Sequence, residues 1–483
     1  MVGLCVGPLR ASSVLVGALC LLGGGCRQSP GPGLTGGGED GGTSSAASTS
    51  NGADDASVTA DDSSGTDGAP APKYDVGGIP DAPPPPTNCE SSKGGGGNGG
   101  PQFSFIWVAN SGEGTVSKIN TVTLEEVGRY RTHPVGGDPS RTSVNLNGDV
   151  AVANRNGGIV KFYANPANCS DANNDGQIQT STGPDDVLAW DDEECRAWFS
   201  EFDYDSQRPV AWTPGVWSQT QCQYLDAKVW TSGASNFWGG KGGPDGGDGG
   251  GDGDDGGGEG GGDGGGGGGP AQGVDVVLLN GDTGVVEELV NIPSVQQDGF
   301  GLYGGAVDQA GNFFGTQLGG GTVVRVRLAD MEVDTWPQTG GGYGMTVDRQ
   351  GRLWTCDYQA SRFDPATEIW DSVVIQGSGG AGCMVDADGV LWLGGDRLTG
   401  VDTDTMEIVA THPVDDGQGW TYLKGISVDF QGYVWAVTGE DRAHRVDPET
   451  GEFETVYGLV WPYTYSDMTG FALANAGGWT PAG

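Results

Sequence analysis

One short segment of the chain carries oxygen side chains at the spacing of a calcium-binding loop. In the segment 171–177 they fall at positions 1, 3 and 5, and a glycine follows for the sharp bend, which resembles the start of an EF-hand-type loop. Position 12 is Thr182, not Glu, so Asp185 or Asp186 would have to supply the missing bidentate ligand. We expect a structural calcium ion here; an Asx-rich turn without metal is the alternative. The expected ligands are Asp171, Asn173, Asp175 and Gln177.

Cysteines form the second group that could do chemistry. Six follow Cys26, namely Cys89, Cys169, Cys195, Cys222, Cys356 and Cys383. An even number outside the cytoplasm predicts disulfides, although six cysteines allow 15 connectivities. Cys169 and Cys195 flank the calcium-like segment and are expected to pair. Cys356 and Cys383 fall on adjacent strands of neighbouring repeats and form a second expected pair, which leaves Cys89 with Cys222 by elimination.

Only three histidines are available for catalysis, His133, His412 and His444. The first two lie in matching Thr-His-Pro-Val contexts, so they occupy equivalent positions of different repeats, which indicates a structural origin. Such positions would not converge on one site, as a catalytic pair must. The spacing of residues also reveals no Ser-His-Asp triad, and the catalytic residues stay unknown.

A repeat that begins near Phe103 must position all of these groups. Its clearest copies, 344–354, 382–392 and 425–435, read Gly, then Val-Asp, then Gly seven residues after the first, then an apolar-Trp pair. Asp can cap a type I turn that Gly closes, and the strand that follows carries an aromatic residue to pack between units. Further copies begin at Gly304, Arg141, Arg208 and Gly470.

Four strands in each unit of about 40 residues indicate a β-propeller, and seven copies indicate seven blades. The last copy, 470–477, lacks the strands that should follow it, and the first folded strands near 105–119 lack the one that should precede them. We therefore predict an all-β, seven-bladed propeller over 101–483, closed by pairing of the C-terminal strand 470–477 with the first strands. An open β-sandwich with repeated turns is the alternative.

The start of each inner strand faces the mouth of the central channel, where propellers generally bind ligands. Glycine occupies this position in five repeats, but Arg141 and Arg208 occupy it in two others, and Tyr303, Tyr343 and Lys424 come immediately before it elsewhere. Basic and aromatic groups at this place predict a binding site for an anionic or sugar-like ligand. The alternative is that the arginines pair with neighbouring aspartates.

The motif Gly-Ile-Ser-Val-Asp-Phe-Gln-Gly-Tyr-Val-Trp at 425–435, followed by Arg-Val-Asp-Pro-Glu-Thr-Gly at 445–451, resembles the streptogramin (virginiamycin B) lyase superfamily and the YVTN and NHL repeat groups. The resemblance covers most of 103–478, but its motifs specify blade architecture. It implies catalysis by histidines with an acidic residue and magnesium. None of the three histidines falls on that motif, which puts lyase activity in doubt.

The N-terminal part reads as an export signal and a tether. An apolar stretch over 11–22 and small residues before Cys26 resemble a bacterial lipobox, so 1–25 would be removed and Cys26 lipidated; a secretory signal with an incidental cysteine is the alternative. Residues 26–100 are rich in Ser, Gly, Asp and Pro, which predicts a disordered tether. Arg27 favours the outer membrane or cell surface, with a periplasmic or secreted protein expected if the lipobox is not used.

Two insertions interrupt the repeat, 164–207 with the calcium-like segment and the Gly/Asp run 239–273, for which a disordered loop is expected. The formal net charge of -41 argues against nucleic acid, because phosphate binding needs a basic face. It also argues against direct docking on an anionic membrane, which leaves the lipid as the only membrane contact.

We therefore expect a monomeric, surface-tethered propeller that acts as a non-catalytic binding or scaffold module for a protein partner or small ligand. The alternative is a divalent-metal-dependent lyase or lactone hydrolase that uses the same channel mouth.

Overall fold

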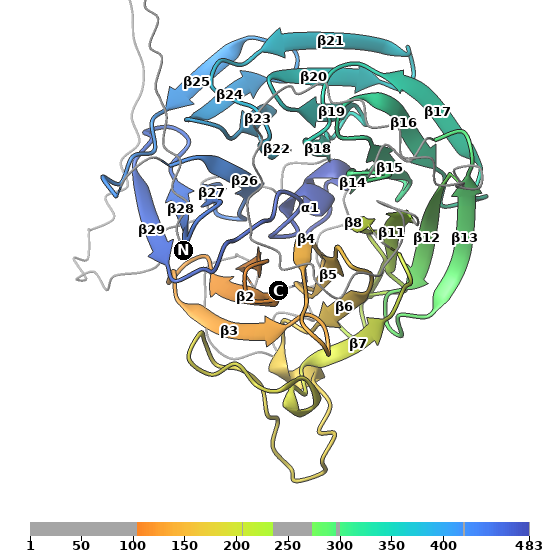
Figure 1. Ribbon diagram of the computed structural model, residues 1–483, viewed down its shortest axis with the longest axis vertical. Coiled ribbons are helices and arrows are strands. Elements are labelled where there is room, and N and C mark those ends of the chain that lie inside the picture. The colour runs from red at the N-terminus through yellow and green to blue at the C-terminus, as the bar shows by residue number, and fades with distance from the viewer. Residues whose placement is uncertain (1–103, 205, 235–272, 296–299, 419–420, 483) are drawn as a thin grey trace, which may run out of the picture. The chain divides into compact units, whose positions relative to one another are not determined.

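Seven antiparallel sheets form a ring in the computed structural model (Figure 1). The structure describes residues 104–204, 206–234, 273–295, 300–418 and 421–482. The expected signal peptide, Cys26, the tether and all but the last residue of the Gly/Asp run lie outside these ranges. No helix in the described part of the chain is long and apolar enough to cross a membrane.

Each blade is a sheet whose strands run from the channel outward in chain order, so the predicted seven-bladed propeller is confirmed. The innermost strands are β4 (Pro139–Val144), β8 (Ser206–Trp212), β14 (Gly304–Val307), β18 (Gly344–Val347), β22 (Cys383–Val385) and β26 (Leu423–Val428). The second strands are β1 (Phe105–Asn110), β5 (Val150–Asn154), β11 (Lys228–Ala234), β15 (Phe313–Thr316), β19 (Leu353–Cys356), β23 (Val390–Leu393) and β27 (Val434–Thr438).

The outer half of each blade completes the sheet. The third strands are β2 (Thr115–Asn120), β6 (Ile159–Phe162), β12 (Val274–Asn280), β16 (Gly321–Val326), β20 (Gln359–Asp364), β24 (Leu398–Asp402) and β28 (Arg442–Val446). The outermost strands are β3 (Glu126–Arg131), β7 (Arg196–Ser200), β13 (Val286–Ile292), β17 (Val333–Gln338), β21 (Ile369–Val374), β25 (Ile408–His412) and β29 (Phe453–Tyr457). Outside the blades lie a hairpin of β9 (Val216–Ser218) and β10 (Gln223–Leu225), the 3-10 helices η1 (Pro166–Asn168) and η2 (Trp190–Asp192), and helix α1 (Phe471–Gly477).

The turn between the first and second strands is built as the repeat predicts. In the blade of β18, Asp348 Oδ1 accepts the backbone N–H groups of Gln350 at 3.0 Å and Arg352 at 2.9 Å, and Gly351 closes the turn at φ +78°. The aromatic residue has a role that the motif did not reveal, because Trp354 Nε1 donates to Asp348 Oδ2 at 2.8 Å. The same bond joins Asp386 to Trp392 and Asp429 to Trp435.

Other buried tryptophans connect neighbouring blades, as expected of the aromatic position. Trp107 Nε1 donates to the carbonyl of Gly148 at 3.2 Å, and Trp230 Nε1 donates to that of Gly311 at 2.9 Å. Both side chains are fully buried. These bonds satisfy the indole N–H groups and fix each blade against the next.

The ring closes near the C-terminus, but not with the residues that the repeat predicted. Phe471–Gly477 form helix α1, with Gly470 as its N-cap, and not an inner strand, so the prediction of an inner strand over 470–477 is wrong. The preceding segment, 460–468, lies along β1, with Trp107 N donating to Met468 O at 2.8 Å and Tyr463 N donating to Ala109 O at 3.0 Å. We call 460–468 the closing segment.

Both testable disulfide predictions are confirmed. Cys169 is bonded to Cys195 within the insertion, and Cys356 at the end of β19 is bonded to Cys383 at the start of β22. Cys222 is also disulfide-bonded, whereas its expected partner, Cys89, lies outside the described residues. In the insertion predicted over 164–207, residues 196–200 form the regular outer strand β7.

Candidate functional site

The five residues predicted at the channel mouth lie together in the structure, with two tyrosines of the closing segment. Arg141 and Arg208 come from the first halves of β4 and β8, Lys424 comes from β26, and Tyr303 and Tyr343 immediately precede β14 and β18. Tyr463 and Tyr465 complete the group. These seven residues are called the mouth cluster below.

The tyrosines of the mouth cluster form a hydrogen-bonded group. Tyr343 donates through its hydroxyl to Tyr463 at 2.7 Å, and the hydroxyls of Tyr463 and Tyr303 are 2.8 Å apart. The ring of Tyr465 lies 4.6 Å from that of Tyr343 and 5.7 Å from that of Tyr303, between ring centres. Tyr303, Tyr343 and Tyr465 are buried and Tyr463 is partly exposed, so they form a rigid aromatic floor.

Arg141 supports this floor from within. It is buried, and its guanidinium donates to the carbonyl oxygens of Ser140 and Tyr303, both at 3.2 Å. Its guanidinium carbon lies 3.0 Å from the ring centre of Tyr465 and 4.8 Å from that of Tyr303. The hydrogen-bond donors and the charge of Arg141 are therefore engaged by groups of the protein itself.

Arg208 and Lys424 differ, because both are partly exposed. The Arg208 guanidinium carbon lies 4.6 Å from the ring centre of Phe300 and 5.0 Å from that of Tyr303. Lys424 Nζ lies 4.7 Å from the ring centre of Tyr343 and 5.6 Å from that of Tyr463. Among the described residues neither charged group donates a hydrogen bond or lies within ion-pair distance of a carboxylate, and Arg208 Nε is buried without an acceptor. Asp138 acts on Arg208 only through a weaker electrostatic interaction.

Cations elsewhere on the propeller are mostly neutralised. The nearest example is Arg155, whose guanidinium carbon lies 4.4 Å from the ring centre of Tyr463 and which pairs with Asp138. Other pairs are Arg129 with Glu126, Lys161 with Asp149, Lys228 with Glu287, Arg325 with Asp334, Arg352 with Asp348, Arg362 with Asp371 and Arg442 with Asp416. The alternative reading, in which aspartates neutralise Arg141 and Arg208, is not what the described residues show.

The cations change the acidity of the tyrosine floor. Burial alone would raise the pKa of Tyr303, but the charges of Arg141 and Arg208 outweigh it and lower that pKa. Burial dominates for Tyr343 and Tyr465, whose pKa values are raised well above the usual range, and it raises the pKa of Tyr463 to about 12. The two guanidinium groups therefore favour the ionised form of Tyr303.

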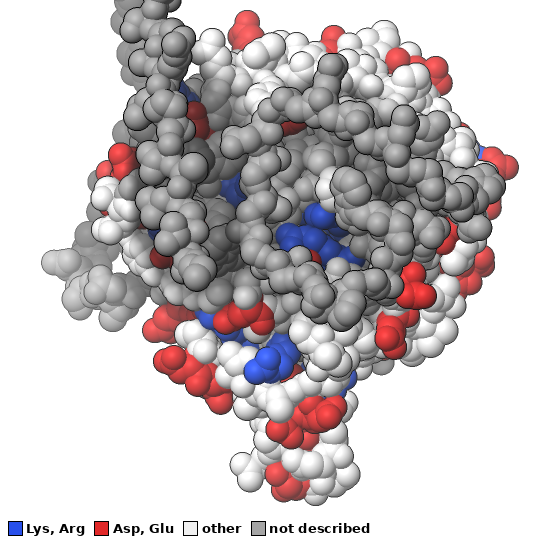
Figure 2. All heavy atoms as spheres, viewed as in Figure 1, with Lys and Arg blue, Asp and Glu red and all other residues white. Residues whose placement is uncertain are grey.

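The surface of this face shows the same contrast in charge. Lys and Arg side chains gather in the hollow at its centre, whereas acidic side chains are scattered around the rim (Figure 2). A local positive potential inside an acidic molecule attracts an anion to the centre and repels it from the rim.

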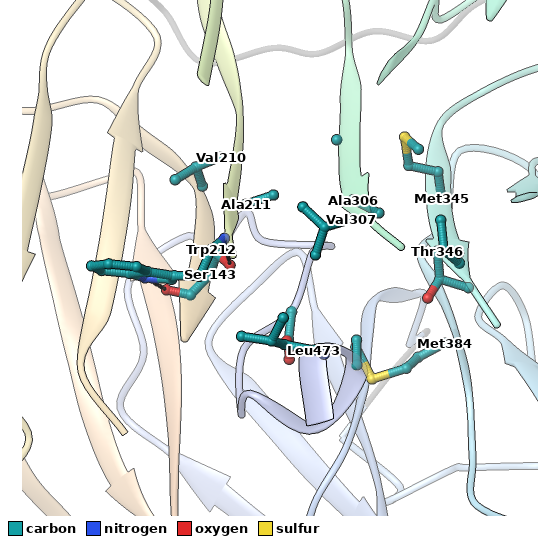
Figure 3. A pocket seen from close by; sticks show the side chains of 14 residues that line it. Ser143, Val210, Ala211, Trp212, Ala306, Val307, Met345, Thr346, Met384 and Leu473 are labelled. Carbon is teal, nitrogen blue, oxygen red and sulfur yellow. Dashed lines mark hydrogen bonds between the residues drawn. The ribbon is translucent and has the colours of Figure 1, made fainter. Parts of the chain in front are cut away.

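A second hollow, separate from the mouth cluster, lies between the inner strands and the C-terminal helix. Inner strands and α1 line a small, mainly apolar cavity, with Leu473 of α1 facing residues such as Val307 and Met384 (Figure 3). Asp467 holds the start of the helix by accepting from the backbone N–H of Gly470 at 2.8 Å and that of Leu473 at 3.1 Å.

The three histidines lie on outer parts of the blades, as the repeat positions indicated. His412 ends β25 and lies 2.8 Å from the carbonyl of Pro448 through Nε2, and His133 follows β3 and packs edge-on against Phe199. His444 on β28 is buried beside Thr455, and burial lowers its pKa to about 4. None belongs to the mouth cluster.

The calcium-like segment forms an exposed turn. Asp171 accepts from the backbone N–H groups of Asp175 at 3.1 Å and Gly176 at 2.9 Å, and Asp175 accepts from that of Gln177 at 2.8 Å. Across the whole described chain, no three His, Cys, Asp or Glu side chains lie close enough together to hold a metal ion.

A carboxylate that the motif did not include, Glu194, reaches this turn. It accepts from the backbone N–H groups of Ala172, Asn173 and Gln179 at 2.9, 3.3 and 2.8 Å. Asp186, one of the two expected substitutes for the missing ligand, bonds Thr182 instead.

The described chain is thus a seven-bladed β-propeller with a cationic and aromatic mouth. No family model and no curated protein matches it. Among solved structures it is similar to a streptogramin B lyase, with 11% identity over 70% of this chain and 88% of that chain and a TM-score of 0.44.

Two structures of virginiamycin B lyase from Staphylococcus aureus are also similar. One shares 13% identity over 66% of this chain and 83% of its own, with a TM-score of 0.40. The other, a catalytically inactive form with quinupristin, shares 14% identity over 67% and 84%, with a TM-score of 0.41. At these values the likeness concerns the fold.

Proposed function

We propose that this propeller is a binding module that captures a small anionic ligand at the mouth cluster. One observation carries the proposal: Arg208 and Lys424 present charge at the channel mouth with no carboxylate in ion-pair distance among the described residues, although the chain has 64 acidic residues. An unpaired, partly buried cation costs free energy. An anion that binds there recovers this cost, so the site is organised for a ligand before the ligand arrives.

Residues of the mouth cluster have two roles: some support the tyrosine floor and others contact the ligand. Arg141 and Tyr465 hold the tyrosine floor, while Arg208 and Lys424 remain accessible for charge-assisted hydrogen bonds to a carboxylate or another oxyanion. Tyr463 is partly exposed, and its hydroxyl bonds those of Tyr303 and Tyr343. Rigid aromatic rings lose little conformational entropy when a ligand packs on them.

Calorimetric titration of the purified propeller with benzoate, and with neutral benzamide as the matched ligand, tests the proposal at fixed ionic strength. We expect benzoate to bind and benzamide to bind at least tenfold more weakly. Arg208→Gln and Lys424→Gln should each weaken benzoate binding about 10- to 100-fold, the worth of one charge-assisted contact. Arg327→Gln and Lys228→Gln remove the same charges from the opposite ends of blades and should leave binding unchanged.

Other results of these experiments would contradict the proposed anion-binding function. If benzoate and benzamide bind alike, or if the Arg327→Gln variant loses as much affinity as Arg208→Gln, the mouth is not an anion site. If the protein instead turns over a streptogramin or lactone with added magnesium, and Arg208→Gln abolishes the turnover, the mouth belongs to an enzyme.

The proposal includes a lipid-linked tether that holds the module at the outer membrane or cell surface. The lipobox-like residues before Cys26 and the long Ser/Gly/Asp/Pro stretch after it support this part. Two acyl signals are enough to anchor a protein stably. We expect the full-length chain to partition with membranes and Cys26→Ala to be released; membrane association of Cys26→Ala would contradict the lipid anchor.

A further inference from the structure

The two accessible cations of the mouth cluster belong to opposite sides of the ring. Arg208 lies on β8 and Lys424 on β26, and Figure 1 shows these strands on either side of the centre. In ring order, the inner strands β14, β18 and β22 separate them on one side. The two cations therefore reach the mouth from different sides of the ring.

Uncharged aromatic groups occupy the space between these two cations. Arg208 contacts the ring of Tyr303 at 5.0 Å and Lys424 contacts that of Tyr343 at 4.7 Å, while the two tyrosine rings lie 5.5 Å apart. Tyr463 bonds both hydroxyls and fixes this spacing. Each cation therefore lies against a different ring of the neighbouring tyrosine pair.

The other charged groups nearby do not change this pattern. Arg141 is buried behind the floor, and Arg155 pairs with Asp138 at the side of Tyr463. Burial lowers the pKa of Arg208, but the neighbouring Tyr465, Tyr303 and Tyr463, and to a smaller extent Asp138, outweigh burial and raise that pKa. Arg208 and Lys424 thus remain the two ends of the accessible charge.

We propose that the ligand is a linear dianion, with an anionic group at each end of an uncharged, flat body about as long as the tyrosine pair. The guanidinium takes one terminal carboxylate or comparable oxyanion, the ammonium takes the other, and the body packs over the tyrosine hydroxyls and rings. This inference rests on the proposed anion-binding function and specifies its ligand class. A monoanion would satisfy one cation and leave the other without a partner.

Three ligands of one shape test the inference: terephthalate, its monomethyl ester and its dimethyl ester, which differ only in charge. At fixed ionic strength we expect terephthalate to bind at least tenfold more tightly than the monoester, and the monoester more tightly than the diester. In Arg208→Gln and in Lys424→Gln the preference for terephthalate over the monoester should fall to less than threefold. Arg327→Gln and Lys228→Gln should retain it.

The arrangement of the charges also predicts a dependence on shape. Isophthalate carries the same two charges at an angle and should bind more weakly than terephthalate, since it cannot reach both cations in line. If terephthalate and its monoester bind with equal affinity to the unmodified protein, the dianion inference is wrong, while the anion site stands. If all three terephthalate compounds bind equally, both the inference and the proposed function fail.

Discussion

Arg141 and Tyr465 connect the two ends of the folded ring at its channel mouth, with the guanidinium carbon 3.0 Å from the centre of the tyrosine ring. Arg141 lies on β4, in the second blade from the N-terminus, and Tyr465 lies on the closing segment. Because Arg141 also donates to the carbonyl of Tyr303, one buried side chain joins ring closure to the candidate site. Stability and binding are therefore coupled at this residue.

Arg141→Gln should lower the free energy of unfolding by about 2–4 kcal/mol, because it removes a buried cation–π contact and two hydrogen bonds and leaves a cavity. Arg208→Gln, at a partly exposed position, should change it by less than about 0.5 kcal/mol and reduce anion affinity instead. Urea denaturation of both variants, beside calorimetric titration with benzoate, measures the two effects. Equal stability of the two variants would contradict a supporting role for Arg141.

The repeat spacing predicted six inner strands correctly and failed at the seventh. The glycines at 470 and 477 match the repeat spacing, but Gly470 and Gly478, both at positive φ, flank helix α1. The segment between them contains Phe, Leu, three Ala and Asn and no β-branched residue, which favours helix over strand. Composition could have corrected what spacing alone suggested.

The repeat pattern also predicted only part of the candidate site. Equivalence within the repeat was enough to find Arg141 and Arg208 at the predicted first position of an inner strand and Lys424 immediately before that position. Tyr463 and Tyr465 were missed because the closing segment was assigned to the wrong residues. Their spacing of two, which places both side chains on one face of an extended segment, was a readable signal.

The contact between Asp429 and Trp435 predicts a pH-dependent stability. Burial raises the pKa of Asp429 to about 6, despite the N–H of Trp435 and the charge of Arg445, which lower it. The folded protein therefore keeps a proton that the unfolded chain loses above about pH 4. The resulting stabilisation is present below pH 4 and is lost as the pH rises through 6.

Asp429→Asn should remove this dependence. Relative to the variant, the unmodified protein should lose about 2–3 kcal/mol of stability between pH 4 and pH 6.5 and no more above that. Asp364→Asn is the matched control, since backbone N–H groups lower the pKa of Asp364 and its contribution changes only below pH 4. Urea denaturation at four pH values measures both, and parallel curves for the two variants would refute the assignment.

The disulfide between Cys356 and Cys383 joins two neighbouring blades beside the mouth. Both residues are buried, and 27 residues separate them. Changing both to Ser should cost about 3–4 kcal/mol through the freed chain entropy of the unfolded state. The Cys169–Cys195 bond spans 26 residues, so its double Ser variant is matched for loop length but lies in the insertion.

We expect the Cys169/Cys195 variant to lose less global stability and to become sensitive to protease within 163–195. Thermal unfolding and limited proteolysis separate the two effects. An equal loss in both variants would show that the insertion unfolds together with the blades.

The segment 171–177 remains a predicted calcium site, and Glu194 refines how it can be tested. Calcium prefers six to eight oxygen ligands, including a bidentate carboxylate. Glu194 already approaches the turn, and its neighbour Cys195 is disulfide-bonded to Cys169 just before the turn.

We expect calorimetric titration to show calcium binding to the unmodified protein, and Asp175→Ala and Glu194→Gln each to weaken calcium binding at least tenfold. Asp192→Asn, a nearby exposed change of equal charge at a residue that is not an expected ligand, should have little effect. Identical titration heats for the unmodified protein and Asp175→Ala would exclude calcium from this turn and leave the Asx-rich turn as its explanation.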